Sequence, residues 1–379
     1  NITKLTIKNT SKELDLINKL KIKQNIIERK NIYWLDKIFW LIQDCKKLGT
    51  ISFAGLARAG FVAIDILNSM VNEKIIDIND RNNFLNSINT VLGDLKKDRS
   101  IMSKKRFLLK YGHLRPNTYE ISSKNYKEGY KLYFKDKINK QTGKNFKKKF
   151  KIDYKKQKKI NLFLKKNKFK LNCKNLFKWM KTSIESREYS KFIFTKSIDL
   201  IFKNIKKFGK RNNLTLEDLS YLKINELINF YYNLELGTVE NQLKKSIIIN
   251  KKNYEETSKI KLPNIILSHK EIYYKEDDKV NVNFIGSKVS GEIIELIDIK
   301  KMNLKNKIVC VENADPGYDF IFSNNIKGLI TKYGGANSHM AIRCHELNIP
   351  AAIGVGEELY NKIKNVKFIT LDSNSQKIY

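Results

Sequence analysis

A histidine that follows a double glycine is the strongest chemical signal in this sequence. The run from Leu329 to Ile342 reads LITKYGGANSHMAI, so an apolar stretch leads into Gly334-Gly335 and then His339. Glycines permit a tight turn that points backbone N–H groups at an anion. A helix starting here adds unpaired N–H groups and a positive dipole end. A neutral imidazole in that place can attack phosphorus and hold the phosphoryl group in a reactive N–P bond.

A less specific interpretation of this histidine stays open, because a single histidine at a helix start is more often a capping or packing residue. The double glycine and the strand-turn-helix context favour the chemical interpretation. Asn337 or Ser338 would cap the helix by accepting a bond from one of its first N–H groups.

The same residues resemble a known family. The run from Gly334 to Ile342, followed by ELNIPAAIG from Glu346 to Gly354, resembles the swivelling phosphohistidine domain of phosphoenolpyruvate synthase, pyruvate phosphate dikinase and the rifampin phosphotransferases. By that resemblance His339 is phosphorylated, and Gly334, Gly335 and Ser338 support the phosphate. His345 departs from the family, which usually has arginine there. Arg343, one turn after His339, could supply the charge or be a surface arginine.

The position of the motif implies an order of domains. In the synthase and the dikinase a large barrel follows the swivelling domain, whereas this sequence ends at Tyr379, too soon after His339 for a barrel. The order resembles that of the rifampin phosphotransferases and glutamine kinase, with an ATP-grasp part first. We find no Gly-rich ATP loop, and the sequence opens at Asn1 without Met. We therefore expect ATP and Mg²⁺ to be used by an N-terminal ATP-grasp domain absent from this chain. We expect no cofactor or metal on the chain itself.

Two further runs resemble the acceptor domain of these enzymes. Phe107–Ile121 reads FLLKYGHLRPNTYEI, nearest to L-glutamine kinase, which makes L-glutamine phosphate for capsule phosphoramidate. Glu185–Phe192 reads ESREYSKF, like an Arg-Glu helix of that domain. The acceptor-binding candidates that follow are His113, Arg115, Tyr119, Arg187, Glu188 and Lys191.

The resemblance suggests a role for most of these candidates. Arg115 could bind an α-carboxylate, and His113 could act as general base or orient the acceptor amide. Arg187 and Lys191, one turn apart, could face an anion, and Glu188 could accept an ammonium. An ordinary salt bridge or packed polar residue is the alternative in each case.

The proline and glycine content of the chain and the length of its predicted elements change near residue 260. Three of the four prolines and eight of the 17 glycines lie from Lys261 onward, where segments become short and β-rich. We expect an α+β protein, with a mostly helical acceptor-binding domain at 1–260 and a small β/β/α swivelling phosphohistidine domain at 261–379. A flexible linker is placed near 254–278. Expected helices are 32–42, 53–71, 75–95, 176–208, 216–234, 338–347 and 357–363, and expected strands are 265–268, 280–285, 292–297, 308–312, 328–331, 351–353 and 368–371.

The composition of the chain leaves one other class of function open. The net charge is +35, and the segment 131–170 is very basic with interleaved aromatics, which suits a nucleic-acid-binding arm. We favour a solvated helical hairpin and compositional drift toward lysine, because no nucleic-acid motif accompanies the charge. The four cysteines are scattered and suggest no metal site or disulfide, as in the cytoplasm. No apolar run predicts a membrane span.

The expected function is phosphoryl relay through His339 to a small acceptor, with the amide of L-glutamine as the leading candidate. An antibiotic hydroxyl and pyruvate are the rival acceptors, the first implying a rifampin-like enzyme and the second one like phosphoenolpyruvate synthase. A roomy apolar pocket near His113 would favour the antibiotic, and a compact polar one an amino acid. A basic nucleic-acid-binding helical protein is the alternative of a different class.

Overall fold

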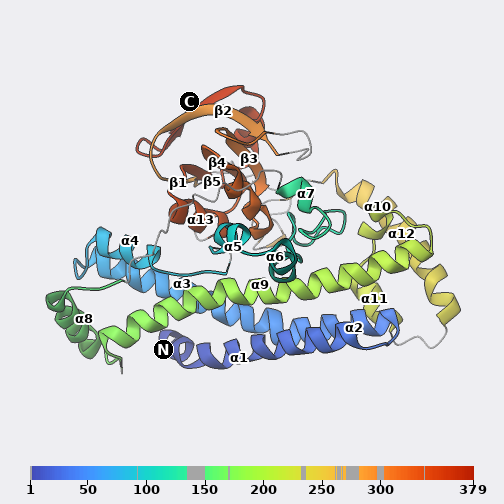
Figure 1. Ribbon diagram of the computed structural model, residues 1–379, viewed down its shortest axis with the longest axis horizontal. Helices are drawn as coiled ribbons and strands as arrows, with labels where there is room; N and C mark the ends of the chain where they lie inside the picture. The colour runs from blue at the N-terminus through green and yellow to red at the C-terminus, as the bar shows by residue number, and fades with distance from the viewer. Residues whose placement is uncertain are drawn as a thin grey trace.

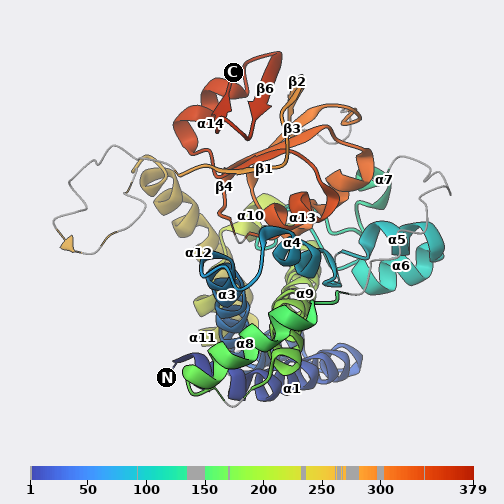
Figure 2. The same ribbon diagram turned by 90° about the vertical axis from the view of Figure 1, so that its left-hand side faces the viewer.

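Long helices form one layer of the protein, and a sheet domain lies against it (Figure 1). The computed structural model describes residues 2–91, 93–134, 150–169, 171–231, 236–260, 262, 266, 268–269, 281–296, 303–336 and 338–379. The view turned by 90° shows helix α13 between the sheet and the helical layer, and α14 on the side of the sheet away from it (Figure 2).

The helical layer is organised around α9, a helix of 39 residues. At 1.5 Å per residue it extends for roughly 58 Å, and α1, α2 and α3 all pack along it. The helices of this part are α1 (Ile2–Arg29), α2 (Trp34–Asp44), η1 (Cys45–Thr50), α3 (Ile51–Asn72), α4 (Ile78–Asn86), α5 (Leu95–Ile101), α6 (Lys104–Tyr111), α7 (Tyr130–Tyr133), α8 (Tyr154–Lys166), α9 (Cys173–Arg211), α10 (Leu216–Ser220), α11 (Ile224–Phe230) and α12 (Leu236–Thr257).

Small residues on α3 allow that helix to pack closely against α9. Ala59, Gly60 and Ala63 are buried on this face, and a Cβ added at Gly60 would lie 3.2 Å from Cδ of Arg187. The stem of Arg187 therefore occupies space that a larger residue 60 would fill. These small residues therefore serve helix packing.

One helical stretch meets the length and composition criteria for a membrane span, contrary to our expectation from the sequence. Residues Trp34–Asn72, continuous through the π-helical turn η1, are long and apolar enough. A core helix of a helical protein passes the same test, and α3 buries part of this stretch against α1 and α9. The criteria alone are therefore weak support for a membrane segment.

The described strands form one mixed sheet in the order β1-β5-β4-β3-β2-β6-β7. The four central strands β2 to β5 run parallel, while β1, β6 and β7 pair antiparallel at the edges. The elements are β1 (Asn283–Ile285), β2 (Val289–Glu295), β3 (Ile308–Asn313), η3 (Pro316–Asn324), β4 (Gly328–Tyr333), α13 (His339–Leu347), β5 (Ala351–Ile353), α14 (Glu357–Ile363), β6 (Phe368–Asp372) and β7 (Lys377–Ile378).

Both faces of the central strands are covered. Val309 of β3 and Met340 of α13 belong to one hydrophobic cluster, while Ile308 and Tyr360 of α14 belong to another on the opposite face. Continuous apolar sequence is what parallel strands buried on both sides require. The sheet thus presents α13, and with it the double-glycine motif, to the helical layer.

The 3₁₀ helix η3 and the residue before it contact the helical part through aromatic rings and hydrogen bonds. Phe320 is fully buried and its ring lies 4.9 Å from that of Tyr133, centroid to centroid. The hydroxyl of Tyr126 donates to the carbonyl of Gly317 at 2.9 Å, and that of Thr118 donates to the Asp315 carboxylate at 2.9 Å. Aromatic packing and hydrogen bonds therefore join the two parts.

Most predicted elements are confirmed, with two corrections. Of the expected helix at 75–95 only α4 is helical; it ends at Asn86 with Ser87 as its C-cap, and α5 begins only at Leu95. The expected helix at 216–234 breaks at Tyr221, where the chain turns between α10 and α11. Neither η3 nor the short β7 was among the expected elements. Two residues of the expected strand 265–268 lie outside the described part, and the two described ones, 266 and 268, are not in a strand; most of the expected linker beyond residue 260 also lies outside the described part.

The expected boundary at 260/261 lies between the end of α12 and the start of β1. In the basic segment, the structure describes α8, while residues 135–149 lie outside the described part. Phe150 and Phe169 pack against the core there, whereas Tyr154 is exposed. The α+β fold class is confirmed.

Gly317→Ala should destabilise the protein by about 1–3 kcal/mol through overpacking. A Cβ at residue 317 would overlap the carbonyl oxygen of Arg115, which is backbone and cannot move aside cheaply. Gly335→Ala is the matched control, because a Cβ there meets nothing within 4 Å. Denaturant unfolding of both variants measures the difference, and equal free energies of unfolding would contradict the prediction.

Candidate active site

The double-glycine turn joins β4 to the helix that begins with His339. Gly334 has φ of +141°, and a Cβ added to it would lie 2.7 Å from the Cβ of Ala314. Because both the backbone angle and the space exclude a side chain, residue 334 has to be glycine. Gly335 has open space around it. The turn therefore brings the backbone close to β3 and leaves its second glycine accessible.

Ser338 caps α13. Its hydroxyl accepts a hydrogen bond from the backbone N–H of Ala341 at 3.3 Å, which satisfies one free donor of the first turn. Asn337, the other expected cap, lies outside the described residues. The cap sets the start of the helix and places His339 in its first turn.

The imidazole of His339 is held between two carboxylates, which we call the carboxylate clamp. Nδ1 lies 3.0 Å from Oε2 of Glu188 in α9, and Nε2 lies 2.8 Å from Oδ1 of Asp319 in η3. His339 is 6% exposed, Glu188 4% and Asp319 1%. The clamp thus joins one carboxylate from the helical part to one from the sheet domain across a buried ring.

The clamp sets the charge of the ring. Burial alone would lower the pKa of His339, but hydrogen bonds and charge from Asp319 and Glu188 outweigh it and raise the pKa to about 9. At neutral pH the ring is therefore an imidazolium, with both N–H groups donating to carboxylates.

The pKa of Glu188 moves in the complementary direction. Burial would raise it, but the hydrogen bond and charge of His339, together with the charge of Arg187, lower it to about 2. The carboxylate is therefore ionised at neutral pH. A buried ion pair of this kind holds because each charge has an opposite charge in direct contact.

A second row of charges completes the cluster. Arg343 donates from Nε to Oδ1 of Asp319 at 3.1 Å and from Nη1 to Oε2 of Glu346 at 2.5 Å. Arg187 lies 3.2 Å from Oε1 of Glu188. His339, Arg187 and Arg343 thus oppose Glu188, Asp319 and Glu346, so the ionised cluster is neutral. No described residue donates to Oδ2 of Asp319, so this carboxylate depends on His339 and Arg343.

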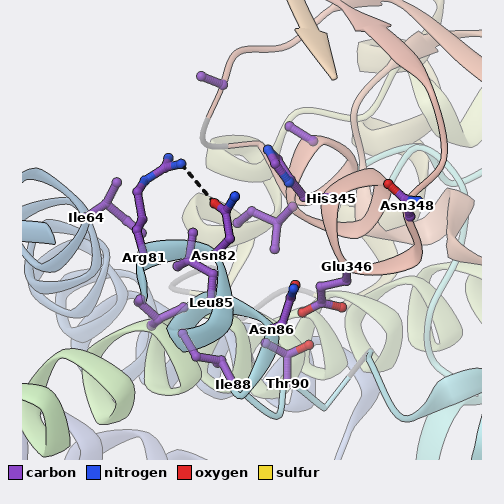
Figure 3. Close-up of a pocket in the computed structure, with 14 residues that line it drawn as sticks. Ile64, Arg81, Asn82, Leu85, Asn86, Ile88, Thr90, His345, Glu346 and Asn348 are labelled. Atoms are coloured by element: carbon purple, nitrogen blue, oxygen red, sulfur yellow. Dashed lines mark hydrogen bonds between the residues drawn. The ribbon is translucent and has the colours of Figure 1, made fainter. Parts of the chain in front are cut away.

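Two cavities flank the clamp. The first, which we call the α4 cavity, has a volume of about 500 Å³ and lies between α4 and α13. Figure 3 shows Arg81, Asn82 and Asn86 on one side of it and His345 and Glu346 on the other. Burial and the charge of Arg81 lower the pKa of His345. His345, which stands where the resembling family usually has arginine, thus lines this cavity.

The second cavity, which we call the glycine-turn cavity, has a volume of about 560 Å³. It lies where the loop after α6 and the middle of α9 meet the double-glycine turn. Most of its lining residues have polar side chains, although the lining surface includes apolar area as well. The residues are Asn117, Thr118, Tyr119, Glu120, Lys191, Asn313, Ala314, Asp315, Tyr333, Gly334 and Ser338. The cavity therefore joins acceptor-domain residues to the turn that carries the histidine.

The structure brings most of the predicted site residues together. Arg187 and Glu188 lie at the His339 ring, and Tyr119 and Lys191 line the glycine-turn cavity with Gly334 and Ser338. Arg343, expected near the phosphate or on the surface, is buried against Asp319.

Two predicted residues are engaged elsewhere. His113 donates from Nε2 to the carbonyl of Phe192 at 2.9 Å, and burial lowers its pKa to about 4, so it is neutral. Arg115 forms an ion pair with Asp199 and donates to the carbonyl of Ser123. Both contacts hold the loop after α6 in place. The acceptor-binding roles of these two residues stay predictions.

Asp319 is the site residue that sequence reasoning missed. Neither the double-glycine motif nor the two acceptor-domain runs include this aspartate. It reaches His339 only because η3 folds back beneath α13, a contact between residues 20 positions apart. An acidic residue within an otherwise apolar turn (GYDFIF) was the available signal, since a buried carboxylate needs a cationic partner.

Comparison with known proteins supports the chemistry suggested by this geometry. Residues 303–376 match the family model described as the PEP-utilising enzyme mobile domain. Rifampicin phosphotransferase of Bacillus cereus is 29% identical over 194 residues, which cover 46% of this chain and 21% of that protein. The enzyme of the same name from Bacillus subtilis is 29% identical over 148 residues, covering 37% of this chain and 16% of that protein.

These matches span about a fifth of the length of the curated relatives. They confirm the expected resemblance of the C-terminal domain to PEP-utilising enzymes, and they make the chain similar to phosphotransferases. The nearer resemblance to L-glutamine kinase stays a prediction.

The His339 side chain should titrate with a midpoint near pH 9. Because the folded-state pKa is raised, the stabilisation it contributes is complete below the ordinary value of about 6.5 and is lost as pH rises through about 9. Glu188 acts in the opposite sense, and its contribution is lost as pH falls through about 2. Nitrogen NMR of the imidazole measures the midpoint directly.

Glu188→Gln should move the His339 midpoint down by at least about one pH unit, since it removes a facing charge. Glu185→Gln is the matched control, because Glu185 lies on the same helix and bonds to the backbone of Asn89 instead. A midpoint near 6.5 in the unmodified protein would contradict the assignment of an imidazolium.

Proposed function

We propose that this chain forms the acceptor-binding and phosphohistidine parts of an ATP-dependent phosphotransferase of the dikinase type. The observation that carries the proposal is the contact between His339 and Glu188. It shows a histidine from a PEP-utilising mobile domain reaching into the centre of a helical domain. A histidine that carries phosphate to an acceptor has to make that approach.

The proposed reaction begins outside this chain. By similarity to the family, ATP bound with Mg²⁺ on an N-terminal ATP-grasp part gives its β-phosphoryl group to His339 while water takes the γ-phosphoryl group, leaving AMP and phosphate. The histidine domain then moves to the helical part and phosphorylates the acceptor. The relatives' greater length is consistent with a separate nucleotide-binding part.

The acceptor that we propose is the side-chain amide of L-glutamine. Support comes from the glycine-turn cavity, because its hydroxyl, amide and carboxylate groups suit a small polar molecule better than an apolar antibiotic. Arg115 is paired with Asp199, so Lys191 is the cation that we assign to the α-carboxylate or the phosphoryl group. The rival acceptors, an antibiotic hydroxyl and pyruvate, stay as outcomes of the test.

The turn beside this cavity is suited to hold a phosphoryl group. Gly334 and Ser338 line the cavity at the start of α13, where unpaired backbone N–H groups and the helix dipole favour an anion. Lys191 lies one helical turn beyond Glu188 on α9. Once the ring is released from Glu188, a phosphoryl group on His339 would thus meet a cation from the acceptor side and N–H donors from its own side.

His339→Asn should abolish phosphoryl transfer, reducing it by more than about 10³-fold, because the nucleophile is removed. The chain is treated with potassium phosphoramidate to load the histidine, and L-glutamine, rifampicin or pyruvate is then added. Phosphorus NMR follows the phosphohistidine and the product. His269→Asn, which alters an exposed histidine, should load and transfer normally.

With protein that also contains a nucleotide-binding part, ATP replaces phosphoramidate and AMP is the readout. Phosphorylated product from the His339→Asn variant would overturn the proposed function. Transfer to rifampicin or pyruvate but not to glutamine would overturn only the choice of acceptor.

Lys191→Gln should weaken the use of the acceptor by about 10- to 100-fold, since a hydrogen bond to a charged group contributes about 1.5–3 kcal/mol. The effect should be seen in KM if Lys191 binds the carboxylate, and in kcat if it binds the transferring phosphoryl group. Lys196→Gln is the matched control on the same helix, because Lys196 bonds to Asn25 at the surface. Unchanged kinetics of Lys191→Gln would remove this residue from the site.

A further inference from the structure

The two ring nitrogens of His339 are both occupied, and by carboxylates that belong to different parts of the protein. We propose that Asp319 and Glu188 hold His339 in its discharged form, and that the clamp has to open before the ring can carry a phosphoryl group. Asp319 is thereby assigned as a positioning residue that acts through His339. The inference rests on the proposed function in one respect, that His339 is the residue phosphorylated.

The geometry of the clamp excludes a phosphorylated ring. Carboxylate oxygens lie 3.0 Å from Nδ1 and 2.8 Å from Nε2 of His339, so a phosphorus atom bonded to either nitrogen would overlap one of them. The side chain is buried and lines neither of the flanking cavities, so a phosphoryl group on the clamped ring would have to displace its neighbours. The clamped ring also has a proton on each nitrogen and therefore no lone pair with which to attack phosphorus.

When the domains separate, the two carboxylates move apart because they belong to different domains. Asp319 lies in the same domain as His339 and is tied to Arg343 of α13, so it moves with the ring. Glu188 lies in the middle of α9 and is tied to Arg187, so it stays with the helical part. Separation thus opens the clamp on one side and frees Nδ1, while Asp319 remains available to hold the proton on the other nitrogen.

Charge makes the clamp sensitive to phosphorylation. The groups around the ring are Glu188, Arg187 and Lys191 from α9, Asp319 from η3, and Arg343 with Glu346 from α13. His339, Arg187 and Arg343 balance the three carboxylates, and Lys191 adds one further positive charge nearby. Phosphorylation replaces one N–H proton of the ring with a phosphoryl group bearing about two negative charges, beside two ionised carboxylates. The clamped arrangement is then opposed by repulsion as well as by sterics.

The clamped state is the state that remains after transfer. On discharge the N–P bond breaks and its electron pair returns to the ring nitrogen. A new bond forms from phosphorus to the acceptor, whose proton passes to that nitrogen. The product is the doubly protonated ring that Asp319 and Glu188 now hold. Reloading reverses the charge change, because one N–H proton has to be lost to solvent before a ring nitrogen attacks a phosphoryl donor.

Hydrogen exchange of the full chain tests the clamp without any acceptor. Backbone amides in segments 183–191 and 314–324, on the two sides of the contact, are followed by mass spectrometry in the unmodified chain and in the phosphoramidate-loaded chain. Loading should raise exchange in both segments at neutral pH by at least tenfold. Equal protection of the loaded and unloaded chains would overturn the proposal.

The pH dependence of the unmodified chain gives a second, independent readout. After correction for intrinsic exchange rates, protection should be lost as pH rises through about 9, where His339 loses its proton. Asp319→Asn should move this midpoint toward the ordinary histidine value of about 6.5. Glu188→Gln should produce the same shift from the other domain, so the test stands if the Asp319 variant does not fold. An unmoved midpoint in both variants would overturn the proposal.

Thr118→Val is the matched control. It removes an interdomain hydrogen bond to Asp315 that does not involve the ring, so it should lower protection by a similar factor at every pH and leave the midpoint in place. A shift of the midpoint in this control would show that the pH dependence reports general loosening and not the clamp. Failure of glutamine as acceptor would leave all of these outcomes unaffected.

Discussion

The structure depends on one constraint, which is that a buried imidazolium needs two carboxylates. His339 satisfies it with one carboxylate from its own domain and one from the helical part. Each of these carboxylates in turn needs its own cation, and Arg343 and Arg187 supply them. Removal of any member would leave an uncompensated charge in the interior, which costs several kcal/mol. The relative placement of the two domains is therefore tied to the charge of a single ring.

The other elements of the fold hold the residues of this cluster in position. The length of α9 allows it to form the core of the helical layer and also to present Glu188 at its middle. Gly60 of α3 leaves the space through which Arg187 reaches that carboxylate. On the opposite side, the sheet fixes α13 through β4, and η3 inserts Asp319 beneath it. His113 and Arg115 brace the loop that meets η3.

Local signals in the sequence predicted what depends on local structure. The double glycine, the Ser338 cap and the histidine follow from rules about turns and helix starts, and the α+β division follows from where proline and glycine gather. The pairing of His339 with Asp319 and Glu188 could not be predicted, because it depends on how distant elements pack. The partners of Arg115 and His113 could not be predicted either, because they also depend on the packing of distant elements. Their residue types fitted acceptor chemistry, but the fold gave each a partner that pattern alone does not reveal.

The aromatic contact at η3 makes the stability of the closed arrangement depend on temperature. Phe320 is buried among Tyr126 and Tyr133 of the helical part, so separation of the domains would expose apolar surface along with charge. Exposure of apolar surface increases the heat capacity, and hydrophobic attraction weakens on cooling. The aromatic and ionic contributions to closure thus vary differently with temperature. At low temperature the ion pairs would contribute more of the free energy that keeps the domains together. On warming toward ambient temperature the contribution of the aromatic rings would increase.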